Sequence, residues 1–172
     1  MGGTKESSMI KMKRVRKIPP AGDYPGVLAP PPVIALVMIA AGFAASLIYP
    51  LRFIHGNARY IAGAALVILS GIVMLSAYFR MRRAGTNVDV RKPATALVTD
   101  GIYSYSRNPM YVGIIILLVA ISVLLNNLWI LIFTPVFIAV MRKGVIEREE
   151  FYLEQKFGAE YTDYKKRVRR WV

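Results

Sequence analysis

Residues 108–141 read NPMYVGIIILLVAISVLLNNLWILIFTPVFIAVM, a run of 34 residues without a charged side chain. As one helix this run would be about 50 Å long at roughly 1.5 Å per residue, whereas the hydrocarbon core of a bilayer is about 30 Å thick. The chain must therefore fold back on itself, and the polar pair Asn126 and Asn127 lies near the middle of the run. The sequence predicts a tight helical hairpin with arms over Pro109–Leu125 and Leu128–Met141.

Two shorter uncharged runs precede this hairpin. The first has 28 residues, 24–51, but Pro30–Pro32 cannot lie inside a helix, so we expect a membrane helix from about Pro32 to about Pro50. The second has 20 residues, 60–79, which is about the length that one crossing requires. Small side chains near its middle would let a neighbouring helix approach closely. They are Ala62, Gly63, Ala64, Ala65, Ser70 and Gly71.

The positive charges give an independent prediction of topology. Of the 23 Lys and Arg residues, six lie in the N-terminal tail, six from Arg80 to Arg107 and nine from Arg142 to Arg170. Only Arg52 and Arg59 lie in the loop between the first two helices. Because Lys and Arg are enriched on the cytoplasmic side of membrane proteins, the sequence predicts four transmembrane helices in the inner (cytoplasmic) membrane, with both termini in the cytoplasm.

The composition excludes several classes of protein. With 55% hydrophobic residues the 172-residue chain is too apolar for an ordinary water-soluble domain. Its net charge of +13 is distributed by topology, so the expected partners are membrane lipids and not nucleic acid. The chain has no cysteine, which excludes disulfides, thiolate nucleophiles and cysteine-ligated zinc, and we expect no metal.

The segment Gly85–Gly113, GTNVDVRKPATALVTDGIYSYSRNPMYVG, lies between the second and third predicted helices. Asn108 is placed to be the N-cap of the third helix, and Pro109 occupies the first helical position. The helix N-terminus would then point at the cytoplasmic interface, where it favours a carboxylate or a phosphate. The simpler alternative is that Asn108 and Pro109 only begin the membrane helix, since every helix end needs such residues.

The C-terminal segment Glu147–Val172, EREEFYLEQKFGAEYTDYKKRVRRWV, is amphipathic. Its pattern predicts a helix that ends at Gly158 and a second short helix after it. Five of the ten acidic residues fall between Glu147 and Glu160, directly after a membrane helix, where an anionic leaflet would favour Lys and Arg. These acids either form ion pairs along the helix or hold a cation near the membrane surface.

Together these segments resemble the isoprenylcysteine carboxyl methyltransferases and their bacterial relatives, which merge into the phospholipid methyltransferases. The resemblance covers roughly residues 85–168 and is carried by the order and spacing of several pieces around the hairpin. These are LVTDGIYSYSRNPMYVG (Leu97–Gly113), Glu149-Glu150, FGAEY (Phe157–Tyr161) and YKKRV (Tyr164–Val168).

The resemblance implies an S-adenosylmethionine-dependent membrane methyltransferase that acts on a lipophilic acceptor. It divides the chain into a basic cytoplasmic tail (1–31), a two-helix scaffold (32–79) and a catalytic region (80–172). It places cofactor contacts at Thr95, Ala96, Leu97, Val98, Asn108, Pro109, Met110, Tyr111 and Glu149. On the acceptor side it suggests Tyr103, and we add Arg142 and Glu150 as candidates.

The nature of the acceptor stays open. The isoprenylcysteine enzymes carry an arginine four residues before the matched glutamate, where this chain has Val145, and an arginine suits a carboxylate. A carboxylate, amine, hydroxyl or thiol acceptor therefore remains possible. The alternatives are a phosphatidylethanolamine-type phospholipid N-methyltransferase and, from another class, a non-catalytic membrane adaptor. The lone His55 is expected on the opposite side of the membrane from both motifs.

Overall fold

The computed structural model describes residues 24–172, and every regular element within that range is a helix. Most of the predicted basic tail, 1–31, lies outside the described residues. The all-helical fold class is confirmed for the described part. The helices are α1 (Pro31–Ile48), α2 (Ala58–Arg83), η1 (Gly101–Ser104), α3 (Pro109–Leu125), α4 (Leu128–Met141), η2 (Arg142–Ile146), α5 (Glu147–Phe157) and α6 (Ala159–Arg167).

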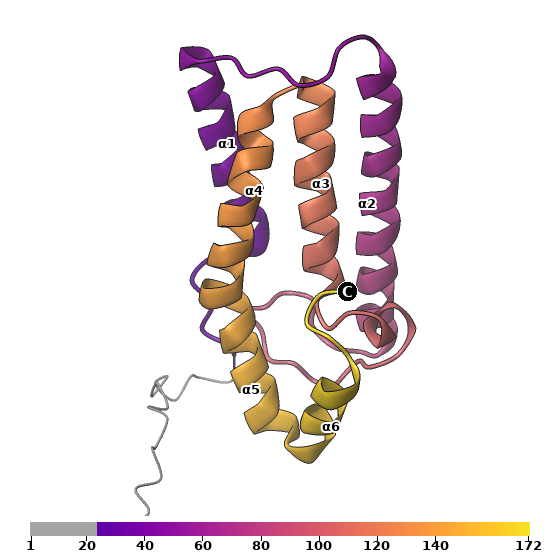
Figure 1. The fold of residues 1–172 in the computed structure, drawn as a ribbon. Coiled ribbons are helices and arrows are strands. Elements are labelled where there is room, and N and C mark those ends of the chain that lie inside the picture. Colours follow the sequence, from indigo (N-terminus) through magenta and orange to yellow (C-terminus); the bar gives the residue numbers. More distant parts are fainter. Residues whose placement is uncertain (1–23) are drawn as a thin grey trace, which may run out of the picture.

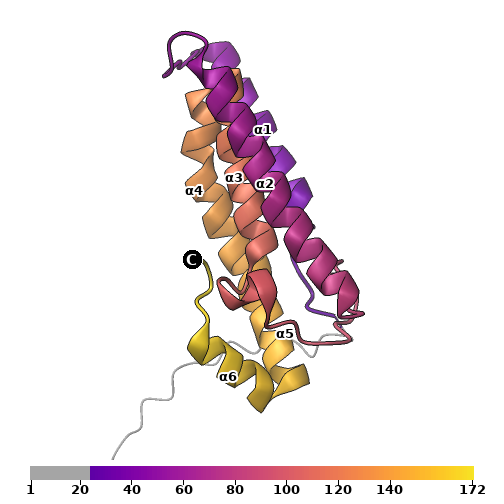
Figure 2. The ribbon, with the colours of Figure 1, turned by 90° about the vertical axis from the view of Figure 1, so that its right-hand side faces the viewer.

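The four helices α1 to α4 lie side by side in an elongated bundle (Figures 1 and 2). α2 packs along α3 and α1 packs along α4. The loop of residues 49–57 crosses the turn between α3 and α4 to join α1 to α2 (Figure 1). Helices α1 and α2 are consecutive in sequence, yet they lie on opposite flanks of the α3–α4 hairpin.

The hairpin has the bounds that the sequence predicts. α3 has 17 residues with Pro109 in its first turn, and α4 has 14 residues. The turn between them is tight because Asn126 adopts the left-handed conformation with φ 48°, which asparagine tolerates better than most residues. The side chain of Asn127 then caps α4 by accepting a hydrogen bond from the N–H of Trp129 at 3.1 Å.

Asn126 also fastens the 49–57 loop across the end of the bundle. Its Oδ1 accepts hydrogen bonds from the N–H groups of Phe53 and Ile54, each at 3.0 Å, and its Nδ2 donates to the carbonyl of Ile54 at 2.8 Å. The N–H of Leu128 donates to the carbonyl of Leu51 at 3.0 Å. These bonds satisfy polar groups that a membrane core would leave without partners.

Small residues allow α2 and α3 to approach closely, as the sequence predicts. A side chain at Gly63 would collide with Leu124, and one at Gly113 would collide with Met74. The hydroxyl of Ser70 is buried and donates to the carbonyl of Gly113 at 2.8 Å. Close packing with such a bond is the usual means by which membrane helices associate, because lipid supplies no hydrophobic drive between them.

Three of the described helices are long and apolar enough to cross a membrane, namely α1, α2 and the continuous helix that begins at Leu128, whereas α3 is shorter. Large apolar side chains remain exposed along α1 and α2, as expected where helices face lipid. The apolar part of the last helix ends at Met141, because the exposed Arg142 and Lys143 follow it. α5 therefore lies beyond the apolar span.

The α-helical part of the second hairpin arm ends at Met141, as predicted, but the helix does not stop there. The helix continues through the π-helical turn η2 into α5 without a break. Within η2 the carbonyl of Gly144 accepts a hydrogen bond from the N–H of Leu28 at 3.0 Å. The widened turn thus anchors the segment that leads into α1.

The C-terminal segment returns to the start of α3. α5 ends at Gly158, which has φ 53°, and α6 follows directly, so the predicted pair of short helices is confirmed. After α6, residues 168–172 run back along the bundle, and the C-terminus lies beside the lower end of α3 (Figure 1). We call residues 168–172 the C-terminal strap.

Candidate functional site

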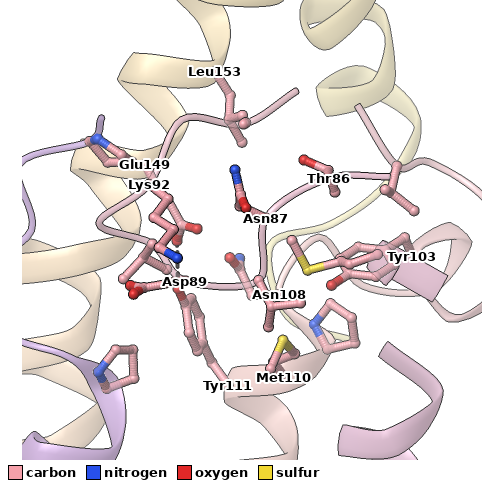
Figure 3. Close-up of a pocket in the computed structure, with 18 of the residues that line it drawn as sticks. Thr86, Asn87, Asp89, Lys92, Tyr103, Asn108, Met110, Tyr111, Glu149 and Leu153 are labelled. Atoms are coloured by element: carbon pink, nitrogen blue, oxygen red, sulfur yellow. Dashed lines mark hydrogen bonds between the residues drawn. The ribbon is translucent and has the colours of Figure 1, made fainter. Parts of the chain in front are cut away.

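A cavity of about 510 Å³ lies at the end of the bundle where α3 begins. Its walls come from the start of α1, the second half of α2, the loop of residues 86–98, η1, the first turns of α3, and α5 and α6. Figure 3 shows side chains of the 86–98 loop around the same space as Tyr103, Asn108, Tyr111 and Glu149. Most of the lining is apolar. The segments that carry the sequence motifs therefore meet at one place.

The 86–98 loop is held closed at its base by two threonines. The hydroxyl oxygen of Thr86 accepts hydrogen bonds from the N–H groups of Thr95 and Ala96 at 3.1 and 3.4 Å, and the hydroxyl of Thr95 donates to the carbonyl of Gly85 at 2.7 Å. Of the four residues predicted as cofactor contacts here, Ala96, Leu97 and Val98 line the cavity. Thr95 is not among the lining residues, because its side chain binds within the base of the loop.

The N-terminus of α3 faces the cavity through Asn108, Pro109, Met110 and Tyr111, all of which line it. Asn108 occupies the N-cap position, as predicted, but its side chain makes no capping hydrogen bond. Its carbonyl accepts from the N–H groups of Tyr111 and Val112, and its amide Nδ2 donates to the carbonyl of Arg170 at 2.9 Å. The side chain therefore connects the helix start to the C-terminal strap.

Glu149 reaches the cavity from α5, where its Oε2 accepts a hydrogen bond from the hydroxyl of Tyr111 at 2.7 Å. The pKa of this carboxyl group is raised to about 7, mainly by removal from water; the hydrogen bond from Tyr111 lowers it in part, and the charge of Glu150 adds to the rise. The second lining carboxylate, Asp89, binds Arg91, which lowers its pKa to about 2. Glu149 is thus the carboxylate that a cationic ligand would meet.

Tyrosines form much of the remaining wall. Burial, with the charge of Glu149, raises the pKa of Tyr103 well above its usual value, and burial raises that of Tyr161 to about 12. The hydroxyl of Tyr164 donates to the carbonyl of Tyr103 at 2.7 Å, and that of Tyr152 accepts from the N–H of Ala94 at 3.1 Å. Tyr103 and Tyr161, which both line the cavity, are therefore neutral near pH 7.

Two predicted acceptor-side residues do not line the cavity. Arg142 is exposed and binds Glu147, with 3.2 Å between Nε and Oε1. Glu150 is buried in a different contact, with Arg107 and Arg170. Helical geometry explains the second case, since adjacent residues point about 100° apart around a helix axis, so that Glu149 and Glu150 face different surroundings. Tyr103, the third candidate, does line the cavity.

Other lining residues had no signal in the sequence. Asn87, Asp89 and Lys92 belong to an irregular loop, and Met74 belongs to the part of α2 that we assigned to the scaffold. Only the return of the chain to the start of α3 places them together. Within residues 24–172 no group of three or more His, Asp or Glu side chains is placed to hold a metal ion.

Comparison with known families agrees with this arrangement. The sequence model of the phospholipid methyltransferase family matches residues 58–160, which include α2, the 86–98 loop, the α3–α4 hairpin and α5. The chain belongs to this family. The matched region contains most of the cavity wall, but it ends before the C-terminal strap.

Among curated proteins the chain is similar to several protein-S-isoprenylcysteine O-methyltransferases. It is 34% identical to that of Schizosaccharomyces pombe over 135 residues, which cover 72% of this chain and 56% of the relative. It is 34% identical to enzyme B of Arabidopsis thaliana over 111 residues, which cover 62% and 55%. The chain therefore spans about half the length of these relatives. A Haemophilus influenzae protein without a described function is 43% identical over its whole length, which covers 37% of this chain.

Proposed function

We propose that the protein is an integral membrane methyltransferase that uses S-adenosylmethionine in this cavity and methylates a lipophilic acceptor, in the manner of an isoprenylcysteine carboxyl methyltransferase. The observation that carries the proposal is the placement of Glu149 beside the N-terminus of α3 in a mostly apolar cavity. Four crossings in the cytoplasmic membrane, with the cavity and both termini on the cytoplasmic side, complete the proposal and agree with the distribution of Lys and Arg.

The chain's own groups fit this cofactor. About 510 Å³ is in the usual range for small-molecule sites. Glu149 would pair with the ammonium group, and the N-terminus of α3 would attract the carboxylate through the helix dipole. The faces of Tyr103 and Tyr161 would lie near the sulfonium, since aromatic rings attract cations.

When bound, S-adenosylmethionine supplies a methyl group on a positively charged sulfur. On transfer, an acceptor lone pair would form a bond to the methyl carbon as the carbon–sulfur bond broke, and the electrons of that bond would neutralise the sulfur. The cavity residues have to align the acceptor and exclude water. Tyr103 and Tyr161 stay protonated near pH 7, so they are poor bases. This favours an acceptor atom that is already unprotonated, such as a carboxylate.

The acceptor would come from the membrane. Pro31, Met74 and Ile114 continue the cavity wall towards the apolar part of the bundle, so an apolar chain would remain in contact with apolar side chains while its reactive end reached the cofactor. No polar group need be exposed to lipid on this route.

Isothermal titration of the detergent-solubilised chain with S-adenosylmethionine tests the cofactor assignment. Glu149→Gln should weaken binding by about a hundredfold, because a buried charge pair is lost while the shape is kept. Glu147→Gln is the matched control, since Glu147 lies on the same helix but pairs with Arg142 away from the cavity. Equal affinity of the wild type and the Glu149 variant would refute the site.

A second candidate is phospholipid N-methylation, which the name of the matching family favours. Labelled cofactor, incubated with membranes and separately with a prenylated cysteine, distinguishes the two by mass spectrometry of the methylated product. Label in an amine headgroup supports the second candidate, and label in an ester supports the first. The absence of cofactor binding, together with salt-sensitive binding to anionic vesicles, would instead favour a membrane adaptor.

A further inference from the structure

Glu150 sits at the centre of a buried ion-pair network on the side of α5 that faces away from the cavity. Its Oε1 lies 2.9 Å from Nη1 of Arg107 and accepts from Nε of Arg170 at 2.9 Å, while its Oε2 accepts from Nη2 of Arg170 at 2.6 Å. The side chains of Glu150 and Arg107 are each only 9% exposed. Both carboxylate oxygens are thus engaged, and the group has no free face with which to meet a substrate.

The same two arginines connect the C-terminal strap to the start of α3. The N–H of Arg107 donates to the carbonyl of Arg169 at 3.0 Å. The carbonyl of Arg170 accepts from Nδ2 of Asn108 at 2.9 Å and from the hydroxyl of Ser106 at 3.3 Å. The strap is therefore fastened to residues 106–108 by its backbone and to α5 by the Arg170 side chain.

This double attachment joins the two walls of the cavity. Asn108 belongs to the wall formed by α3, and Glu149, the neighbour of Glu150, belongs to the wall formed by α5. Trp171, which follows Arg170, packs against the core of the bundle. The distance between the helix N-terminus and the Glu149 carboxylate is consequently fixed twice, inside the cavity by the hydrogen bond from Tyr111 to Glu149 and outside it by the strap.

We propose that the Glu150–Arg170 pair and the C-terminal strap are a positioning device that holds Glu149 and the N-terminus of α3 at the spacing that the cofactor needs. The inference depends on the proposed cofactor site and adds a role for residues that do not touch the ligand. Burying such a network costs desolvation energy and adds little net stability. Its use is geometric, because the bidentate fork of Arg170 and the single contact of Arg107 fix one carboxylate in both distance and orientation.

The first test is the affinity of the full chain for S-adenosylmethionine. Arg170→Gln should raise Kd by about tenfold to a hundredfold, as small misplacements in a binding site do. Arg170→Lys keeps the charge but not the fork and should give a smaller rise. Arg167→Gln is the control, because it removes the same charge from an exposed position at the end of α6. Its affinity should stay within about twofold of the wild type.

A double-variant cycle separates positioning from general weakening. If Arg170 acts through Glu150, adding Glu150→Gln to Arg170→Gln should weaken binding no further than the more severe single variant does. Additive losses would overturn the proposal, as would an Arg170→Gln protein that folds and binds like the wild type. If Arg170→Gln does not fold, Arg170→Lys decides in the same way.

A second measurement needs no ligand. The chain has two tryptophans, and Trp129 lies at the other end of the bundle, so Trp129→Phe leaves Trp171 as the reporter of the strap. In that background Arg170→Gln should shift the emission to longer wavelength, and exchange of the Arg107 amide hydrogen should accelerate. An unchanged emission spectrum and an unchanged exchange rate would overturn the proposal that the Arg170 side chain holds the strap in place. A wild type with a docked strap that binds no S-adenosylmethionine would instead refute the proposed function.

Discussion

An asparagine lies at each end of α3, Asn126 at the end closed by the loop of residues 49–57 (the closed end) and Asn108 at the end that opens on the cavity (the open end). The two side chains have different roles. Asn126 makes three hydrogen bonds to the backbone of the loop of residues 49–57 and closes the bundle at that end. Asn108 donates once, to the C-terminal strap, and otherwise lines the cavity. At the closed end the polar groups of the turn are satisfied by the fold itself. At the other end Glu149 and the start of α3 line the cavity, where a ligand would contact both.

Because the hydrogen bonds of Asn126 hold the closed end together, the largest loss of stability is expected there. Asn126→Ala removes the acceptor of two backbone N–H groups and places alanine at φ 48°, so the free energy of unfolding should fall by about 3 kcal/mol. Thermal unfolding in detergent measures this loss. The affinity of the surviving folded protein for S-adenosylmethionine should be unchanged. A selective loss of affinity would mean that the closed end contributes to the site.

Asn108→Ala should show the reverse. One hydrogen bond is lost, which costs about 1 kcal/mol of stability, but the start of α3 is released from the strap. We expect Kd for S-adenosylmethionine to rise about tenfold. Isothermal titration and a thermal melt of the same sample give both quantities. A variant that loses stability but keeps its affinity would place Asn108 with Asn126 as a purely structural residue.

A change of pH should alter the affinity for S-adenosylmethionine through Glu149, at the open end, and should leave the closed end unaffected. Since the pKa of Glu149 in the ligand-free cavity is about 7, the carboxylate is increasingly protonated below that pH and loses its attraction for an ammonium group. Affinity should therefore fall by up to about tenfold for each pH unit below 7 and level off above it. Titrations between pH 5.5 and 7.5 measure the slope, and Glu149→Gln should give a flat profile over the same range.

The smallest effect is expected for His55, in the loop of the closed end. His55→Ala should change the free energy of unfolding by less than about 0.5 kcal/mol and the rate of methyl transfer by less than about twofold. The reason is that His55 is exposed and far from the cavity. Assay of labelled methyl transfer alongside the wild type checks this. A large loss of transfer would contradict the separation of the two ends.

The sequence predicts those parts of the fold that depend on local chemistry. Pro109 and the pair Asn126-Asn127 fix the bounds of the hairpin, since proline begins helices and asparagine accepts the conformation of a tight turn. Gly158 divides α5 from α6 for a similar reason. Each of these signals acts within a few residues of its position, and each is confirmed by the structure.

The contacts between distant segments could not be predicted in this way. Arg170 meets Glu150 across 20 residues and Asn108 across 62, and no periodic pattern encodes such a pairing. The local pattern does not separate Glu149 from Glu150, and only the family resemblance assigned Glu149 to the cofactor. The 86–98 loop is a similar case. Its shape depends on the hydroxyl of Thr86, and since hydroxyl side chains are common in polar loops, the sequence does not show that this one holds the loop closed.

The π-helical turn η2 lies between α4 and α5 and holds one residue more than an α-helical turn. If one residue between Arg142 and Ile146 were deleted, the turn could close as an ordinary α-helical turn, because the five residues of η2 rotate the chain by about as much as four α-helical residues do. Glu149 and Glu150 would then keep nearly their present directions. The loss would fall on the widened turn itself, where the carbonyl of Gly144 binds the N–H of Leu28. η2 therefore behaves as an absorbed insertion, which reshapes the helix surface next to α1 while α4 and α5 keep their relative orientation.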